Sequence, residues 1–196
     1  MLSGADSPPE AIRQEKAALR KAILARRGAV DADSRSRHSQ TITQKVCALP
    51  GYRAAHVVAA YASFGSEFDT SAFVADILGA GKQLLLPRIN FVFHSLELRH
   101  VVDPGADLVA GLWGIREPAL HCPVISPIAV EFILVPGVAF TVAGARLGYG
   151  GGYYDGLLGE LSPVVPRIAA AFELQLVDRI PEGPRDRRVD RVVTET

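Results

Sequence analysis

Short apolar runs, separated by segments with helical periodicity, are the feature that most limits the folds open to this chain. The strongest runs span residues 54–62, 130–135 and 166–172, and a shorter run at 84–86 precedes Pro87. Apolar runs of this length are typical of strands buried on both faces, as in parallel sheets. Because helical segments alternate with them, the sequence predicts an α/β domain with a mainly parallel sheet.

The rest of the chain divides into helices, weaker strands and loops. Helices are predicted at 10–28, 33–49, 70–78 and 153–161, and weaker strands at 92–101 and 189–194. Residues 103–128 and 136–152 are rich in glycine or proline and are predicted to be irregular. We expect residues 1–9 to form a flexible leader. Residues 10–196 are expected to form a single domain, because a chain of 196 residues has the usual length of one domain.

Charge and composition argue against several classes of protein. Twenty-one basic residues balance 21 acidic ones, and this zero net charge disfavours a nucleic acid partner. No apolar stretch approaches the roughly 18 residues of a membrane span, and the N-terminus lacks the apolar core of a signal peptide. Cys47 and Cys122 have neither zinc-type spacing nor a disulfide framework. We expect a cytoplasmic protein without a membrane partner, either monomeric or weakly dimeric.

A glycine-rich stretch between a predicted strand and a predicted helix carries the strongest functional signal. Five of the nine residues from 144 to 152 are glycine, and Arg146 and Asp155 accompany them. Glycines let a backbone approach a ligand closely, and their amides with a following helix N-terminus suit a phosphate. Arg146 would add positive charge, and Asp155 could hold Mg²⁺ through oxygen. The alternative is a surface turn, since the stretch matches neither Walker A nor dinucleotide-binding spacing.

Three weaker signals involve charged side chains. Lys16 and Arg20 share one helical face, where like charges are unfavourable unless an anion lies between them; the alternative is a solvated face. Glu67 follows a predicted strand, at the end where open α/β sheets bind ligands. Asp190 lies in an arginine-rich segment and could complete a metal site or form surface ion pairs.

The single tryptophan, Trp113, lies between glycines in the irregular segment. It could stack on a flat ligand, or it could anchor the long loop in the core. The sequence leaves both interpretations open.

Together, and in this order, these segments resemble the 5-formyltetrahydrofolate cyclo-ligase family from Lys16 to Glu195. The most specific part is Leu-Val-Pro-Gly-Val-Ala-Phe-Thr at 134–141, which runs into the glycine stretch at 146–155. Segments 111–118 and 171–175 add independent support. The resemblance implies a single three-layer Rossmann-like α/β domain, with a mainly parallel sheet flanked by helices.

The resemblance also implies the reaction. The family uses ATP and Mg²⁺ to turn 5-formyltetrahydrofolate into 5,10-methenyltetrahydrofolate, with release of ADP and phosphate through a phosphorylated formyl intermediate. The protein's task is then mostly positioning and charge neutralisation, as in other phosphoryl transfers. The implied partners are a reduced folate and a nucleotide, without nucleic acid.

Residue roles follow from the same resemblance, which implies that Lys16 and Arg146 are catalytic and that Asp155 and Asp190 bind Mg²⁺. The implied ATP-binding residues are Lys16, Ala17, Ala18, Leu19, Arg20, Arg146, Leu147, Gly148, Tyr149, Gly150, Gly151, Gly152, Tyr153 and Tyr154. The implied folate-binding residues are Arg20, Ala62, Glu67, Trp113, Tyr149, Gly150, Gly151, Gly152, Tyr153 and Tyr154. We expect the loop that carries Arg146 to lie at the surface, so that changing Arg146 to Ala would reduce turnover more than stability.

The chain departs from the family pattern at a few positions. Tyr149 and Gly151 occupy the middle of the glycine stretch, where many relatives carry a basic residue, and Gly156 replaces a common arginine. Arg185 stands near a place where histidine is common. Three alternatives remain: a nucleotide- or folate-binding paralogue without turnover, another ATP-dependent ligase, and a small RNA- or protein-binding module.

Overall fold

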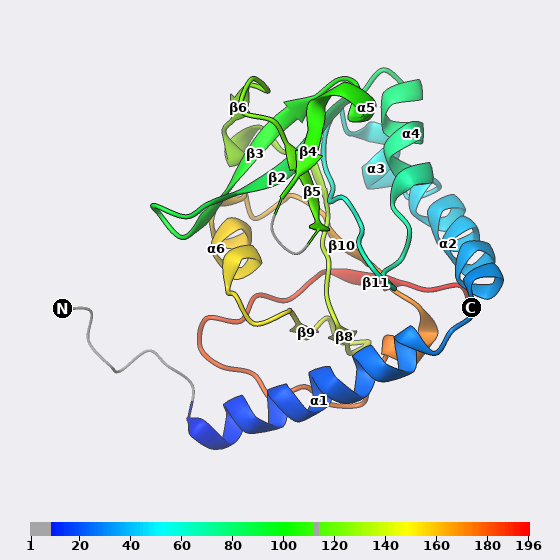
Figure 1. The fold of residues 1–196 in the computed structure, drawn as a ribbon, viewed down its shortest axis with the longest axis vertical. Coiled ribbons are helices and arrows are strands. Elements are labelled where there is room, and N and C mark those ends of the chain that lie inside the picture. The colour runs from blue at the N-terminus through cyan, green and yellow to red at the C-terminus, as the bar shows by residue number, and fades with distance from the viewer. Residues whose placement is uncertain (1–8, 112–113) are drawn as a thin grey trace.

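A seven-stranded sheet runs through the part of the chain that the computed structural model describes, residues 9–111 and 114–196 (Figure 1). Its strands are β1 (Val57–Ala59), β2 (Gln83–Asn90), β3 (Ser95–Val101), β6 (Val124–Ile125), β7 (Phe132–Leu134), β10 (Arg167–Ala170) and β11 (Arg191–Val193). The spatial order is β11-β10-β7-β1-β2-β3-β6. The strands from β11 to β2 in this order pair in parallel, and β3 and β6 extend the sheet antiparallel.

Helices and two small ladders surround this sheet. The helices are α1 (Glu10–Gly28), α2 (Ala32–Cys47), α3 (Pro50–Ala54), α4 (Ser71–Gly79), α5 (Pro104–Asp107) and α6 (Tyr153–Glu160), with short 3-10 turns η2 (Pro127–Ala129) and η3 (Glu173–Gln175). The ladders are β4 (Leu108–Ala110) with β5 (Arg116–Pro118), and β8 (Ala139–Phe140) with β9 (Arg146–Leu147).

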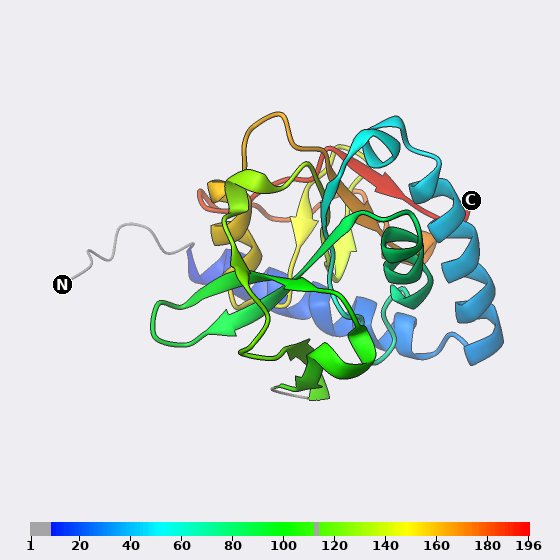
Figure 2. The same ribbon diagram turned by 90° about the horizontal axis from the view of Figure 1, so that it is seen from above.

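Alternating side chains of the central strands produce two apolar layers. In β7, Phe132 and Leu134 pack with α2 and α4, whereas Ile133 packs on the opposite face with α6. Successive side chains of a strand point to opposite faces, so an all-apolar strand must be covered on both. Figure 2 shows α2 and α4 on one side of the sheet and α6 on the other. The predicted three-layer α/β fold with a mainly parallel sheet is confirmed.

Helix α1 packs against the β8–β9 ladder in a third apolar cluster. Ile23 of α1 contacts a group that includes Ala139 and Leu147, all nearly fully buried. This packing holds the chain that follows β9 beside α1, although more than a hundred residues separate them. The contact therefore positions the glycine stretch against the basic face of α1.

Some predicted boundaries and loops are wrong. The run at 54–62 contains the strand β1, which is only three residues long. The first residue of the run belongs to the short helix α3 instead. Residues 136–152 include the β8–β9 ladder, and residues 103–128 include α5, β4, β5 and β6. Elements of two to four residues are too short to show a periodic pattern.

Two expectations concern the ends of the chain and the membrane. The predicted leader falls mostly on residues 1–8, which lie outside the described residues. Among the described helices, none has the length and apolar character that crossing a bilayer would require.

Candidate active site

The basic face of α1 meets the glycine stretch directly. The Nε atom of Arg20 donates a hydrogen bond to the carbonyl oxygen of Gly148 at 2.7 Å. Lys16, which is buried, forms an ion pair with Asp186. Burial lowers the pKa of Arg20, and the nearby carboxylate of Asp186 opposes that effect. The anion expected between the two cations is therefore present, and it is a carboxylate of the chain itself.

The other predicted residues of this helix segment differ in exposure. Ala17 and Ala18 are exposed, whereas Leu19 packs against the apolar cluster under the β8–β9 ladder. Of the five predicted residues on α1, Arg20 is therefore the one that hydrogen-bonds the glycine stretch, and Lys16 is the one that pairs with Asp186.

A buried polar cluster lies where the chain leaves β1. Tyr149 donates its hydroxyl proton to Glu67 and accepts a hydrogen bond from Arg27 Nη2 at 2.9 Å. The second carboxylate oxygen of Glu67 accepts from the backbone N–H of Phe64 at 3.0 Å, and Arg27 also reaches Ser66. Glu67 is only 6% exposed. Burial raises its pKa, and the hydrogen bonds from Tyr149 and Phe64 oppose the rise.

Two further tyrosines face this carboxylate. Burial raises the pKa of both Tyr61 and Tyr154, and the negative charge of Glu67 adds to the effect. Within the described residues the buried hydroxyl of Tyr154 has no hydrogen-bond partner. A buried polar atom without a partner costs free energy, so this hydroxyl is suited to contact a polar ligand atom.

Arg146 lies beneath the glycine stretch rather than at its surface. Its Nη2 donates to Asp155 Oδ1 at 2.6 Å and its Nη1 to the Pro136 carbonyl oxygen at 3.3 Å. Its side chain is 3% exposed, whereas residues 149–152 are exposed, so the expectation of a surface loop holds only for its second half. The reason is the β8–β9 ladder, which folds this residue inward. A methyl group at Gly148 would lie 2.9 Å from Arg146 Nη1, so glycine is needed where the chain passes the guanidinium.

The two predicted metal ligands have different surroundings. Asp155 stands in the first turn of α6, and its Oδ1 also accepts from the backbone N–H of Arg187 at 3.0 Å. Asp190 is exposed and accepts from the backbone N–H of Arg167, at the beginning of β10. Within the described residues, Asp155 and Asp190 share no hydrogen-bond partner. Their joint role as Mg²⁺ ligands stays a prediction.

The glycine stretch adopts backbone conformations that few other residues allow. Gly150 has φ 106° and Gly152, the N-cap of α6, has φ 73°. Both values lie in the region that side chains disfavour. His94, from the tip between β2 and β3, contacts the Gly151 carbonyl oxygen at 3.1 Å and lies against the ring of Tyr153 at 4.5 Å. The stretch is thus held from the sheet side and from α1.

Sequence reasoning missed three residues of this site: Arg27, His94 and Asp186. Arg27 follows Lys16 by eleven residues, about three helical turns, so its shared face was readable from the sequence. His94 and Asp186 carried no such signal, because each reaches the site from a separate loop or turn. Trp113 lies outside the described residues, and Ala62 is half-buried just after β1.

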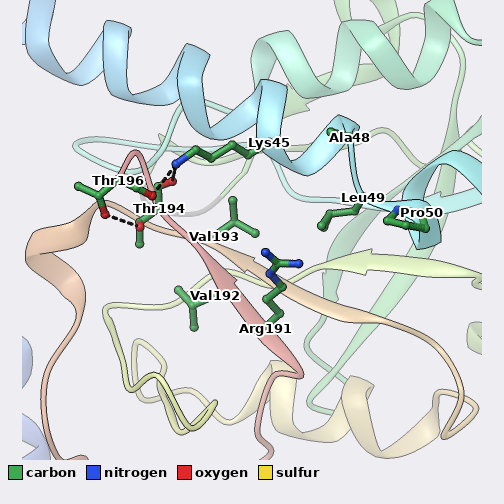
Figure 3. Close-up of a pocket in the computed structure, with 9 residues that line it drawn as sticks. All are labelled: Lys45, Ala48, Leu49, Pro50, Arg191, Val192, Val193, Thr194 and Thr196. Atoms are coloured by element: carbon green, nitrogen blue, oxygen red, sulfur yellow. Dashed lines mark hydrogen bonds between the residues drawn. The ribbon is translucent and has the colours of Figure 1, made fainter.

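Two surface hollows help to delimit the site. One is polar, adjoins Glu67 and includes Arg35, Phe64 and Asp69 in its lining. The other lies between α2 and β11, where Lys45 holds the final carbonyl groups of the chain (Figure 3). This second hollow includes none of the predicted site residues, so it does not extend the site.

Fold and site together define an α/β protein with a mainly parallel sheet and a glycine-rich loop that meets a basic helix face and a buried carboxylate. Residues 12–195 match the model of the 5-formyltetrahydrofolate cyclo-ligase family. The chain is 30% identical to the 5-formyltetrahydrofolate cyclo-ligase of Mus musculus, over 94% of this chain and 95% of the relative. It is also 30% identical to that of Escherichia coli K12, over 88% of this chain and 96% of the relative.

A solved structure agrees with these matches. The 5,10-methenyltetrahydrofolate synthetase of Aquifex aeolicus superposes with a TM-score of 0.81 at 34% identity, covering 92% of this chain and 90% of that one. The chain belongs to the 5-formyltetrahydrofolate cyclo-ligase family and is an enzyme of the ligase class.

Proposed function

We propose that the protein converts 5-formyltetrahydrofolate into 5,10-methenyltetrahydrofolate, using ATP and Mg²⁺ and releasing ADP and phosphate. Family membership and the names of the relatives support the substrate and product. The observation that carries the proposal for this chain is the meeting of basic α1, glycine loop and buried Glu67 in one place.

The nucleotide phosphates are proposed to bind between α1 and the glycine loop. Arg20 is held over the loop by Gly148, and the amides of Gly150, Gly151 and Gly152 precede a helix N-terminus, where anions are favoured. Lys16 reaches a phosphate by exchanging its partner Asp186 for it. Arg146 contributes positive charge from beneath the loop, where low water content strengthens its field.

The reduced folate is proposed to bind on the Glu67 side of the loop. The buried carboxylate offers an acceptor to N–H groups of the pterin, and the Tyr154 hydroxyl offers an unused polar contact. Tyr149 connects the two halves of the site, since it belongs to the loop and contacts Glu67. Ala62, Tyr153 and Trp113 are proposed to complete the walls of the folate site.

The proposed reaction has two chemical steps. The formyl oxygen attacks the γ-phosphorus of ATP, and the bond to the bridging oxygen breaks, releasing ADP. N10 then attacks the activated formyl carbon, its proton leaves, and the carbon–oxygen bond breaks to release phosphate. The protein lowers both barriers mainly by alignment and by opposing the charge on the phosphoryl oxygens.

Mg²⁺ is proposed to bind at Asp155, whose carboxylate oxygens suit a hard cation. The ion would supply positive charge to the phosphates when bound. Both contacts of Asp155 given above use Oδ1, which leaves Oδ2 for the ion. Asp190 stays a prediction, because its carboxylate contacts the beginning of β10 rather than the glycine loop.

The decisive experiment mixes purified protein with 5-formyltetrahydrofolate, ATP and Mg²⁺ and follows the near-ultraviolet absorbance of methenyltetrahydrofolate. We expect growth of that absorbance only with ATP, and one ADP formed per product. A flat trace from folded protein that binds ATP would refute turnover and favour the nucleotide- or folate-binding paralogue.

A matched pair of variants tests the nucleotide site. Arg20→Ala should weaken ATP binding, measured by calorimetry, by about 10- to 100-fold, since a charged hydrogen bond contributes about 1.5–3 kcal/mol. Lys21→Ala removes a neighbouring charge from the exposed side of the same helix and should leave ATP affinity unchanged. Equal affinities in both variants would contradict the placement of the phosphates.

The cytoplasmic location and the monomeric or weakly dimeric state of the protein stay predictions.

A further inference from the structure

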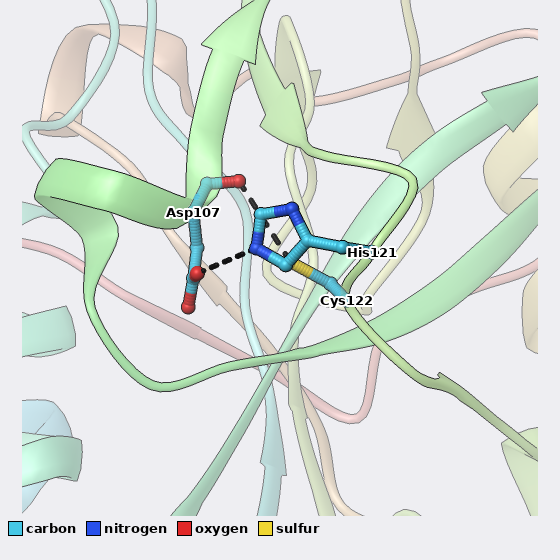
Figure 4. Close-up of side chains that lie close together, drawn as sticks. All are labelled: Asp107, His121 and Cys122. Atoms are coloured by element: carbon cyan, nitrogen blue, oxygen red, sulfur yellow. Dashed lines mark hydrogen bonds and ion pairs between the residues drawn. The ribbon is translucent and has the colours of Figure 1, made fainter.

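Asp107, His121 and Cys122 bring three kinds of metal ligand together outside the site described above. A carboxylate oxygen, a ring nitrogen and a thiol sulfur from these residues all lie within 4.8 Å of one another. His121 Nε2 lies 3.0 Å from Asp107 Oδ1, and Cys122 Sγ lies 3.8 Å from the backbone oxygen of Asp107. Figure 4 shows the three side chains lying close together, with both contacts drawn as dashed lines.

The spacing is close to that of a tetrahedral metal site. An ion with ligand distances of about 2.0–2.3 Å holds neighbouring donor atoms about 3.3–3.6 Å apart. His121 Nε2 and Asp107 Oδ1 are 3.0 Å apart and would have to separate slightly to bind one ion. The sulfur of Cys122 would have to move about an ångström closer to them.

Surrounding groups already hold the donors in place. The second oxygen of Asp107 accepts from the backbone N–H groups of Val102 and Asp103 at 2.9 and 3.0 Å, which fixes the direction of the first. The buried guanidinium of Arg99 donates to the carbonyl oxygens of Leu120 and Cys122 at 3.0 and 2.8 Å. Such outer contacts orient ligands in established metal sites.

We propose that Asp107, His121 and Cys122 bind one divalent transition metal ion of the zinc class. A thiolate, a carboxylate and a neutral imidazole carry two negative charges, which balance a divalent cation. Sulfur and nitrogen donors favour Zn²⁺ or Co²⁺ over Mg²⁺, which prefers oxygen. On binding, the thiol proton goes to solvent, and His121 binds through Nε2 with its proton on Nδ1. Three protein ligands leave the fourth position to water.

The ion would join the two chain segments at the base of the β4–β5 hairpin. Asp107 immediately precedes β4, and His121 and Cys122 follow β5 within four residues. Because each segment would contribute a ligand to the same ion, the ion would hold the two ends of the hairpin together. The site therefore predicts metal-dependent stability, independently of the proposed reaction.

Cobalt is the most informative probe, because a bond between Co²⁺ and a thiolate gives an intense near-ultraviolet band. We expect reduced, metal-free protein to show this band on titration with Co²⁺, saturating at one equivalent in excess Mg²⁺. Zn²⁺ should then displace Co²⁺ and raise the thermal unfolding midpoint. Absence of the band would overturn the proposal.

Single substitutions identify the ligands. His121→Ala removes an exposed side chain, so the variant should fold, and it should weaken Co²⁺ binding by about 100-fold or more. Cys122→Ser should abolish the near-ultraviolet band. His56→Ala and Cys47→Ser are the matched controls and should bind as the parent protein does. A band that survives His121→Ala, or that is lost in Cys47→Ser, would overturn the assignment.

Discussion

Replacing Tyr149 by Phe should make the stability of this protein more sensitive to pH. The substitution removes the hydroxyl that donates to Glu67 and accepts from Arg27, while the ring remains. Burial already raises the pKa of Glu67 above its ordinary value, and Tyr149 opposes that rise. Without the hydroxyl, the pKa of Glu67 in the folded protein should rise further.

The size of the effect follows from this hydrogen bond. A bond to a charged group contributes about 1.5–3 kcal/mol and a neutral bond about 0.5–1.5 kcal/mol. Tyr149 is 40% exposed, so we take the lower part of each range. The expected loss of unfolding free energy is about 0.5 kcal/mol when Glu67 is protonated and about 2 kcal/mol when it is ionised. The difference corresponds to a rise of about one pKa unit.

The direction with pH is fixed by linkage. A carboxyl group whose pKa is higher in the folded state binds protons more tightly there, so it favours folding at low pH. That contribution is lost as pH rises from the unfolded pKa through the folded pKa of Glu67. The difference between parent and Tyr149→Phe should therefore be smallest near the unfolded pKa and largest above the folded one.

Urea unfolding at about pH 4.5 and about pH 8 measures this difference, because the two values bracket the titration expected for a raised glutamate pKa. Tyr153→Phe is the control, since it removes a tyrosine hydroxyl from the same loop while the ring that lies against His94 remains. When Glu67 is first replaced by Gln, the loss of unfolding free energy caused by Tyr149→Phe should be the same at both pH values. A loss that is equal at both pH values, or larger at low pH, would refute the reasoning.

Four further substitutions test other parts of the structure. Arg146→Ala should lower the free energy of unfolding by about 3 kcal/mol, measured in urea, because it leaves Asp155 without its buried partner. Asp155→Asn should shift the Mg²⁺ titration of activity to higher concentration, and an unchanged titration would contradict the proposed metal role. Gly144→Ala should destabilise the protein by about 2–4 kcal/mol, since φ is 85° there and a methyl group would lie 2.1 Å from the Val189 oxygen. Gly156→Ala, in a helix with open space, should instead stabilise it by about 0.5–1 kcal/mol in the same urea assay.

The layers of the fold could be predicted from the sequence, but its short strands and helices could not. Strand β7 lies inside the predicted run at 130–135, because consecutive apolar residues have to be covered on both faces. The β8–β9 ladder was missed, since its strands have two residues each and pair across a glycine-containing turn. That ladder buries Arg146, which is why the expectation of a surface loop did not hold for this residue.

The candidate metal cluster shows a related limit. Spacing rules look for cysteines and histidines at short intervals, and His121 and Cys122 alone match none. The third ligand, Asp107, precedes His121 by 14 residues and reaches it because β4 and β5 pair as a hairpin. A single carboxylate at that separation carries no signal until the hairpin is known.

Charge balance on α1 links the sequence argument to the proposed function. Lys16 and Arg20 repel one another at a spacing of four residues, so their burial against the glycine loop needs an anion. In the structure Asp186 supplies it, held in turn by the backbone N–H of Gly183. A phosphate entering this place would replace one carboxylate with a more highly charged group that has more acceptor atoms. In the proposed function, nucleotide binding would therefore be an exchange of partners rather than the desolvation of bare cations.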